Sequence, residues 1–228
     1  MSVRVGIVVF PGSNCERDCR RAIESFGAQT IYVWHKETSL PDVDIVVLPG
    51  GFAHGDYLRT GAIARFSPVM GAVRAHADAG GLVIGICNGF QVLCEAGLLP
   101  GALRKNSGLK FICRWVELRV EVDRSPFTVR TKAGQRLRIP INHFEGSWYC
   151  ASNELRRVRA NGQVVLRYEA NPNGALDDVA GLTNERGNVF GLMPHPERAC
   201  DPLSGSADGA VIIGSMLDSI SLREPAHL

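Results

Sequence analysis

The 228-residue chain lacks the features that mark several large protein classes. Its 25 basic and 23 acidic residues leave a formal charge of only +2, so electrostatics give no reason to expect nucleic acid or an anionic membrane as a partner. No apolar run approaches the roughly 20 residues that cross a bilayer. The segment Met1–Phe10 lacks the positive region and cleavage site of a secretory signal. We therefore expect a cytoplasmic protein.

The cysteines form no recognisable framework. There are seven, an odd number, and no C-x-x-C pair occurs, so neither a disulfide framework nor a zinc site is expected. In a reducing compartment most of them should be small buried hydrophobic residues. The set is Cys15, Cys19, Cys87, Cys94, Cys113, Cys150 and Cys200.

The chain also lacks a G-x-x-x-x-G-K-[ST] loop and any other recognisable ATP site. We therefore expect no cofactor and no metal in this chain. It has no internal repeat, no low-complexity segment and no composition shift that marks a linker. The length fits one large domain or two small ones, and we interpret residues 1–228 as a single domain.

In the first half, short β-branched runs alternate with segments of helical periodicity. This alternation indicates βαβ units and a parallel sheet with helices on both faces. Strands are expected over Val3–Phe10, Thr30–Trp34, Asp44–Leu48 and Leu82–Ile86. Helices are expected over Gly61–Ala79, Asn88–Ala96 and a segment that starts with a capping box of Ser13 and Glu16 and runs to Phe26.

The second half is dominated by short strand patterns, which we interpret as an antiparallel extension of one α/β domain. A hairpin connection is expected over 184–188 and a last helix over Asp208–Ser221. The expected strands are Phe111–Val122, Leu137–Ile141, Val164–Tyr168, Val179–Thr183 and Val189–Leu192.

Cys87 lies in a G-x-C-x-G motif, Gly85-Ile86-Cys87-Asn88-Gly89, between an expected strand and an expected helix. The same context with serine is the nucleophile elbow. The two glycines let strand and helix approach closely, and the helix N-terminus favours a thiolate. Cys87 is therefore a candidate nucleophile at the carboxyl edge of the sheet. The alternative is a buried cysteine between two packing glycines.

His195 and Glu197 flank Pro196 in a proline-rich segment. Proline biases the preceding residue toward extended geometry, in which residues two apart project to the same side. A carboxylate could then hold one imidazole tautomer, as in nucleophilic triads. The alternative is a surface turn with an exposed histidine.

An oxyanion formed by such a nucleophile requires backbone donors. The Asn88 N–H follows the nucleophile at the helix start, and Gly51 lies in a glycine turn after a neighbouring strand. The alternative is that the glycine turn containing Gly51 is an ordinary turn with no role in binding.

These residues stand in a wider set of motifs that resembles the class I (triad) glutamine amidotransferases, and within them the glutaminase subunits of phosphoribosylformylglycinamidine synthase. Cysteine with H-P-E marks the broad class, whereas C-N-G-F-Q together with G-D-Y-L-R is much narrower. The matching blocks are Phe10–Glu16, Pro49–Phe52, Gly55–Arg59, Gly85–Gln91, Glu95–Gly101, Asn171–Gly174 and Gly191–Arg198.

The resemblance implies a flavodoxin-like amidotransferase fold and a role for each matching position. These roles are Cys87 as nucleophile, His195 as general base and acid, Glu197 as its orienter, Gly51 and Asn88 as oxyanion-binding amides, and Gln91 as a residue that helps to hold glutamine.

The chain departs from the family pattern around the pocket rim. His143 falls where the family usually has His-Gly-Glu-Gly, with Phe144 in place of the first glycine, and His54 replaces a usual tyrosine. His143 is a further candidate. Asp56 and Arg59 either form a surface ion pair or lie near the glutamine pocket or the partner interface.

By resemblance, the chain hydrolyses L-glutamine to glutamate and ammonia and passes the ammonia to a PurL-like synthetase subunit. That subunit would use ATP and Mg²⁺ to make formylglycinamidine ribonucleotide from formylglycinamide ribonucleotide in purine biosynthesis, with a small PurS-like third subunit. The alternatives are the glutaminase of another amidotransferase, a cysteine peptidase or γ-glutamyl hydrolase of the same superfamily, and an inactive regulatory subunit. Gln91 and the narrower matching blocks argue against the hydrolases, and the retained cysteine and histidine argue against an inactive subunit.

Overall fold

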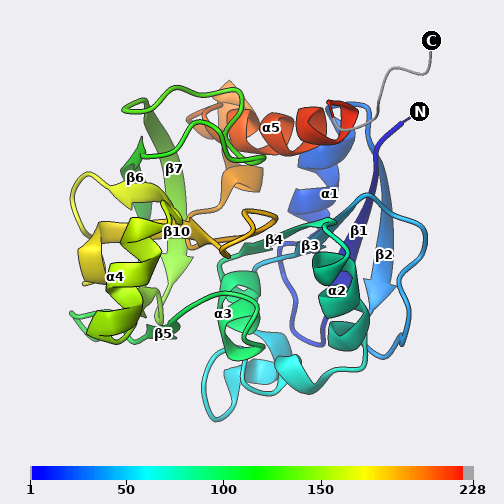
Figure 1. Cartoon of the computed structure of the whole chain (residues 1–228), viewed down its shortest axis with the longest axis horizontal. Coiled ribbons are helices and arrows are strands. Elements are labelled where there is room, and N and C mark those ends of the chain that lie inside the picture. Colours follow the sequence, from blue (N-terminus) through cyan, green and yellow to red (C-terminus); the bar gives the residue numbers. More distant parts are fainter. Residues whose placement is uncertain (1, 223–228) are drawn as a thin grey trace.

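A computed structural model describes residues 2–222, and one nine-stranded sheet runs through both halves of this segment (Figure 1). In spatial order its strands are β2 (Gln29–Trp34), β1 (Arg4–Val9), β3 (Ile45–Leu48), β4 (Leu82–Ile86), β11 (Val189–Leu192), β10 (Val179–Thr183), β9 (Val164–Tyr168), β6 (Ile112–Val120) and β7 (Arg136–His143). The strands from β2 to β11 are parallel, and those from β10 to β7 are antiparallel. A separate pair joins β5 (Ala102–Arg104) to β8 (Ser147–Tyr149). The expected mostly parallel sheet with an antiparallel extension is confirmed.

Helices cover both faces of the parallel part. Figure 1 shows α1 (Glu16–Glu24) and α5 (Gly209–Ser221) on one face, and α2 (Val69–Asp78) and α3 (Asn88–Glu95) on the other. Helix α4 (Ser152–Ala160) lies beside the antiparallel part. Because two layers of helices exclude water, β3 and β4 are buried along their whole length and read as continuous apolar runs. The parallel strand order β2-β1-β3-β4-β11 is that of a flavodoxin-like sheet.

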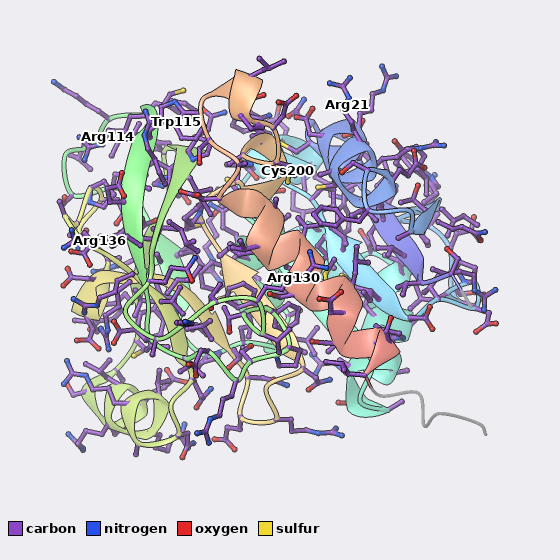
Figure 2. All side chains as sticks on the ribbon, turned by 90° about the horizontal axis from the view of Figure 1, so that it is seen from above. Arg21, Arg114, Trp115, Arg130, Arg136 and Cys200 are labelled. Carbon is purple, nitrogen blue, oxygen red and sulfur yellow. The ribbon has the colours of Figure 1, made fainter. Side chains whose placement is uncertain are left out.

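Helix α5 is tied to the loop that joins β6 to β7. Figure 2 shows Arg130 lying along this helix, where its guanidinium pairs with Asp218 through Nε at 2.6 Å and Nη2 at 2.8 Å. Gly214 leaves room for that side chain, since an added Cβ would lie 2.1 Å from Arg130 Nη1. The last helix therefore closes one face of the sheet and packs against the turn η4 (Pro196–Arg198), near Cys200 in Figure 2.

The expected start of the first helix was wrong. The Ser13 hydroxyl accepts the Phe10 N–H at 3.0 Å and caps no helix, and α1 begins at Glu16 after Cys15 without a side-chain cap. The reason is a bridge between Ser13 and Gly51, which holds this segment against the loop after β3.

The helix expected over Gly61–Ala79 was wrong in its first half. Gly61 has a left-handed φ of 77° and packs against α3, where an added Cβ would lie 2.8 Å from the Gln91 carbonyl carbon. Helix α2 begins only after Pro68. The elements α4, β5 and β8 were not predicted, because β5 and β8 have three residues each and α4 fully buries only Val158.

Within residues 2–222, no helix combines the length and the apolar character that a bilayer crossing requires.

Candidate active site

Three neighbouring parallel strands bring the candidate residues together. Cys87 follows β4 directly, and His195 lies three positions after the end of β11. These two strands pair with Ile86 opposite Leu192, and the Cys87 N–H donates to the Leu192 carbonyl at 2.8 Å. On the other side of β4, β3 ends just before the glycine turn that contains Gly51. Carboxyl ends of adjacent parallel strands share one edge, so side chains more than a hundred positions apart meet there.

Cys87 has the strained backbone of an elbow, with φ of 50° and ψ of −103°. A non-glycine residue in such a conformation costs about 1–3 kcal/mol and persists only where its surroundings enforce it. The flanking glycines allow the enforcing contacts. An added Cβ would lie 2.5 Å from Leu93 Cδ1 at Gly85 and 2.0 Å from the Leu48 carbonyl oxygen at Gly89.

His195 and Glu197 form a buried pair. The imidazole Nδ1 lies 2.7 Å from Glu197 Oε1, and the His195 N–H donates to the Pro140 carbonyl of β7 at 2.8 Å. A carboxylate only accepts, so Nδ1 carries the shared proton. His195 Nε2 is buried without a hydrogen-bond partner among the residues that the structure describes, which leaves it available to a reacting group.

The charge of this pair is set by its neighbours. Burial alone acts to lower the pKa of His195, but the charges of the Glu197 carboxylate and of a Cys87 thiolate outweigh it and raise the pKa above its ordinary value. The raised pKa favours the protonated form of the imidazole, which can then act as a proton donor near Cys87.

Gly51 and Asn88, the residues expected to bind an oxyanion, both lie at this edge of the sheet. The residues before and after Gly51 make the backbone hydrogen bonds to the segment that follows β1. The N–H of Gly51 itself takes no part in these hydrogen bonds. Gly51 has a φ of 149°, and an added Cβ would lie 2.7 Å from the Gly12 carbonyl oxygen, so only glycine fits. Asn88 is the first residue of α3, and its N–H has no acceptor within the helix.

A cavity of about 220 Å³ opens at this edge of the sheet. Its lining includes Cys87 and two acidic residues, Asp56 and Glu145. Burial first and the Glu145 charge second raise the pKa of Asp56 to about 6, against a hydrogen bond from Asn88 that lowers it. The lining residues are Gly51, Phe52, Asp56, Thr60, Cys87, Gln91, Asn142, His143, Phe144 and Glu145. A larger groove of about 630 Å³, between the end of α3 and α4, contains none of the candidate catalytic residues.

Gln91 lines this cavity, but its carboxamide is engaged within the protein. Its Oε1 accepts from Asn88 Nδ2 at 2.8 Å, and its Nε2 donates to the Glu145 carbonyl at 2.5 Å. The Asn88 amide also accepts the Ala53 N–H at 3.0 Å and donates to Asp56 at 3.1 Å. Gln91 and Asn88 therefore join α3 to both walls of the cavity.

The three remaining candidates, Asp56, Arg59 and His54, lie in different places. Asp56 lines the cavity, whereas Arg59 makes a two-pronged ion pair with Glu95 at the surface, through 2.6 and 2.7 Å contacts. Asp56 and Arg59 therefore do not form the ion pair that was one of the alternatives. His54 lies away from the cavity lining, 3.4 Å from Ser67 and with its ring edge on His35.

Two further residues of this region, Cys15 and Arg198, had no role predicted from the sequence. Cys15 Sγ lies 4.0 Å from His195 Nδ1, and Arg198 Nη2 lies 3.1 Å from the same sulfur. Both residues belong to matching sequence blocks, which was the available signal. Ligand atoms of Cys15, His195 and Glu197 lie within 4.8 Å of one another, a spacing that could hold a metal ion. The 2.7 Å contact within the pair is a direct hydrogen bond, so we interpret the cluster as an oriented base.

Comparison with known proteins agrees with this geometry. A family model described as a CobB/CobQ-like glutamine amidotransferase domain matches residues 2–210. Among curated proteins, the phosphoribosylformylglycinamidine synthase subunit PurQ of Salinibacter ruber is 53% identical over 97% of this chain and 99% of its own length. That of Rubrobacter xylanophilus is 54% identical over 94% of this chain and 98% of its own.

Solved structures give the same result. A chain in the structure of PurLQS from Thermotoga maritima is 45% identical, covers 96% of this chain and 100% of its own length, and superposes with a TM-score of 0.90. A further glutamine amidotransferase from Thermotoga maritima, 18% identical with a TM-score of 0.62 and covering 97% of this chain and 98% of its own, supports the fold alone.

Proposed function

The chain belongs to the PurQ subunits of phosphoribosylformylglycinamidine synthase, within the CobB/CobQ-like glutamine amidotransferases, and from this premise we propose a role for each residue of the site. It is a glutaminase of purine biosynthesis, which hydrolyses glutamine to glutamate and ammonia. The observation that carries this function is the meeting of Cys87, after β4, with the oriented His195–Glu197 pair, after β11.

The reaction begins with attack of the Cys87 thiolate on the carboxamide carbon of glutamine. The N–H groups of Gly51 and Asn88 hold the oxyanion, and each such donor contributes about 10²–10³ in rate. Protonated His195 gives its Nε2 proton to the leaving nitrogen, the C–N bond breaks, and ammonia departs. This proposal is supported by the raised pKa of His195 and by its unpartnered Nε2.

The second half of the reaction hydrolyses the γ-glutamyl thioester. Neutral His195 takes a proton from water, the water oxygen attacks the thioester carbon, and the C–S bond breaks to release glutamate and the Cys87 thiolate. Proton transfer of this kind contributes about 10²–10⁴ in rate. Glu197 holds the imidazole in position throughout.

The cavity also fits the other end of the substrate. Glutamine carries a positive α-ammonium group, and Asp56 and Glu145 supply carboxyl groups to the cavity that contains Cys87. We assign these two residues to the α-ammonium group. Gln91 positions one wall, since its amide holds the Glu145 backbone and the Asn88 side chain.

We further propose that the chain assembles with a PurL-like synthetase and a small PurS-like subunit, as the name of the related PurLQS complex states for that protein. In this assembly the synthetase binds ATP and Mg²⁺, and this chain binds neither. Exposed apolar side chains beside the cavity support docking there, since Tyr57 is 73% and Leu58 93% exposed. The proposal also includes a single domain over the chain and a cytoplasmic location, which its seven free thiols suit.

The test is a reconstituted complex that contains Cys87→Ala. Glutamine-dependent amidine synthesis should fall by at least about 10³-fold, because the nucleophile is gone. Synthesis with added ammonium should stay within about twofold of wild type, since the synthetase is untouched. Glutamine-dependent synthesis at the wild-type rate would overturn the assignment of Cys87.

A further inference from the structure

His143 ends β7, and its buried ring lines the same cavity as Cys87, yet the mechanism gives it no role. The ring lies close to Gly146, in the space that a side chain there would fill. An added Cβ at that glycine would lie 2.1 Å from His143 Cε1 and 2.3 Å from Nδ1. The ring is therefore fixed in place by a contact that only glycine permits.

Asn106, which is wholly buried, decides which ring nitrogen carries the proton. Its Nδ2 donates to the carbonyls of Lys110 at 2.9 Å and of His143 at 3.0 Å, which fixes Oδ1 on the opposite side. That oxygen accepts the Gly146 N–H at 3.1 Å and lies 3.1 Å from His143 Nδ1. An amide oxygen only accepts, so Nδ1 must donate and Nε2 of the neutral ring is bare.

The bare nitrogen is an acceptor and nothing else. His143 Nε2 is buried and has no hydrogen-bond partner within the part of the chain that the structure describes. Burial first and the charge of His195 second lower the pKa of His143 to about 3. The ring therefore stays neutral at physiological pH and neither donates from Nε2 nor carries charge. A buried polar atom of this kind calls for a partner, and because His143 lines the cavity that contains Cys87, a ligand bound there can supply it.

Glutamine offers two kinds of N–H donor, the α-ammonium group and the side-chain carboxamide. The carboxyl groups of Asp56 and Glu145 match the ammonium, whereas the positive His195 beside His143 repels a cation. We propose that His143 Nε2 accepts a hydrogen bond from the carboxamide NH₂ of glutamine, which makes His143 a determinant of specificity for amides. This inference rests on the proposed glutaminase function.

The same acceptor disfavours ligands that lack an N–H at that position. The γ-carboxylate of the product glutamate presents only oxygen acceptors, and a γ-ester of glutamate has no N–H to offer. Either group leaves His143 Nε2 without a partner, and the carboxylate also places its charge against a lone pair. The leaving ammonia keeps N–H donors, so the contact persists through the first half of the reaction.

The test compares two substrates in the reconstituted complex, glutamine and the γ-methyl ester of glutamate, with wild type, His143→Phe and His143→Gln. His143→Phe should lower kcat/KM for glutamine about 10–100-fold, the loss expected for a buried hydrogen bond, and for the ester less than about threefold. His143→Gln, whose amide oxygen can reach the position of Nε2, should restore most of the preference for glutamine.

Equal losses on both substrates would overturn the inference, since a purely structural residue affects them alike. Failure of the wild-type complex on glutamine would instead overturn the proposed function. A second measurement uses the wild-type chain, so its result does not depend on whether the variants fold. ¹⁵N NMR should show His143 protonated at Nδ1 and bare at Nε2, and a ring protonated at Nε2 would contradict the inference.

Discussion

Gly50 is the position at which one added methyl group tests the active-site geometry most sharply. A Cβ there would lie 2.8 Å from His195 Cε1 and 3.1 Å from Cys15 Sγ. Carbon atoms in contact prefer separations of about 3.5–4.0 Å, so the first distance falls short by about 0.7 Å or more. The backbone of Gly50 is not in the left-handed region, so alanine adds no backbone strain there. The clash must then be relieved by movement of the imidazole.

A displacement of about 1 Å at a catalytic group costs about 10²-fold in rate. We therefore expect Gly50→Ala to lower kcat for glutamine hydrolysis by about 10²-fold, while synthesis with ammonium in the complex stays unchanged. Gly71→Ala is the matched control, because nothing lies within 4 Å of its added Cβ on α2. It should keep the wild-type rate and gain about 0.5–1 kcal/mol in stability. Wild-type glutamine turnover by Gly50→Ala would refute the reasoning.

Two further predictions concern pH. Burial, then the Glu145 charge, raises the pKa of Asp56 to about 6 against the Asn88 hydrogen bond, so its carboxylate forms only above that pH. The value of kcat/KM for glutamine should therefore fall as the pH drops below about 6. Asp56→Asn should lower kcat/KM about tenfold at neutral pH and flatten this acid limb of the pH profile. An acid limb that is unchanged in the variant would contradict the assignment of Asp56. The Glu197 charge raises the pKa of His195, whereas burial lowers it, and Glu197→Gln removes that charge. The imidazolium should then deprotonate at lower pH, so the alkaline limb of the kcat profile should shift to lower pH. The rate of Glu197→Gln should still exceed that of His195→Ala, which loses about 10²–10⁴, and the reverse order would count against both roles.

The surroundings of Cys87 were predictable because the causes are local. A β-branched run, two glycines around the cysteine and a helical pattern fix the strand, the elbow and α3 within a dozen positions, and β4 spans the expected Leu82–Ile86. The pairing of β4 with β11 is different. It joins segments about a hundred positions apart, and periodicity carries no information on which strands are neighbours. The resemblance to a family supplied that link.

Other features lay outside the reach of any motif. The tautomer of His143 depends on Asn106, which belongs to none of the matching blocks and reaches the ring only because β7 and the loop after β5 meet in space. Cys15 stood in a matching block, but its place beside His195 follows from the Ser13–Gly51 bridge, where a capping box was expected. Local patterns could not weigh these long-range contacts.

Two thiols flank the same imidazole, and only one of them is assigned to attack glutamine. The most direct measurement is therefore labelling of the reconstituted complex with a diazoketone analogue of glutamine, followed by peptide mass mapping. We expect one label per chain, on Cys87, and none in Cys87→Ala. A label on Cys15, or full glutaminase activity after Cys87 is blocked, would contradict it.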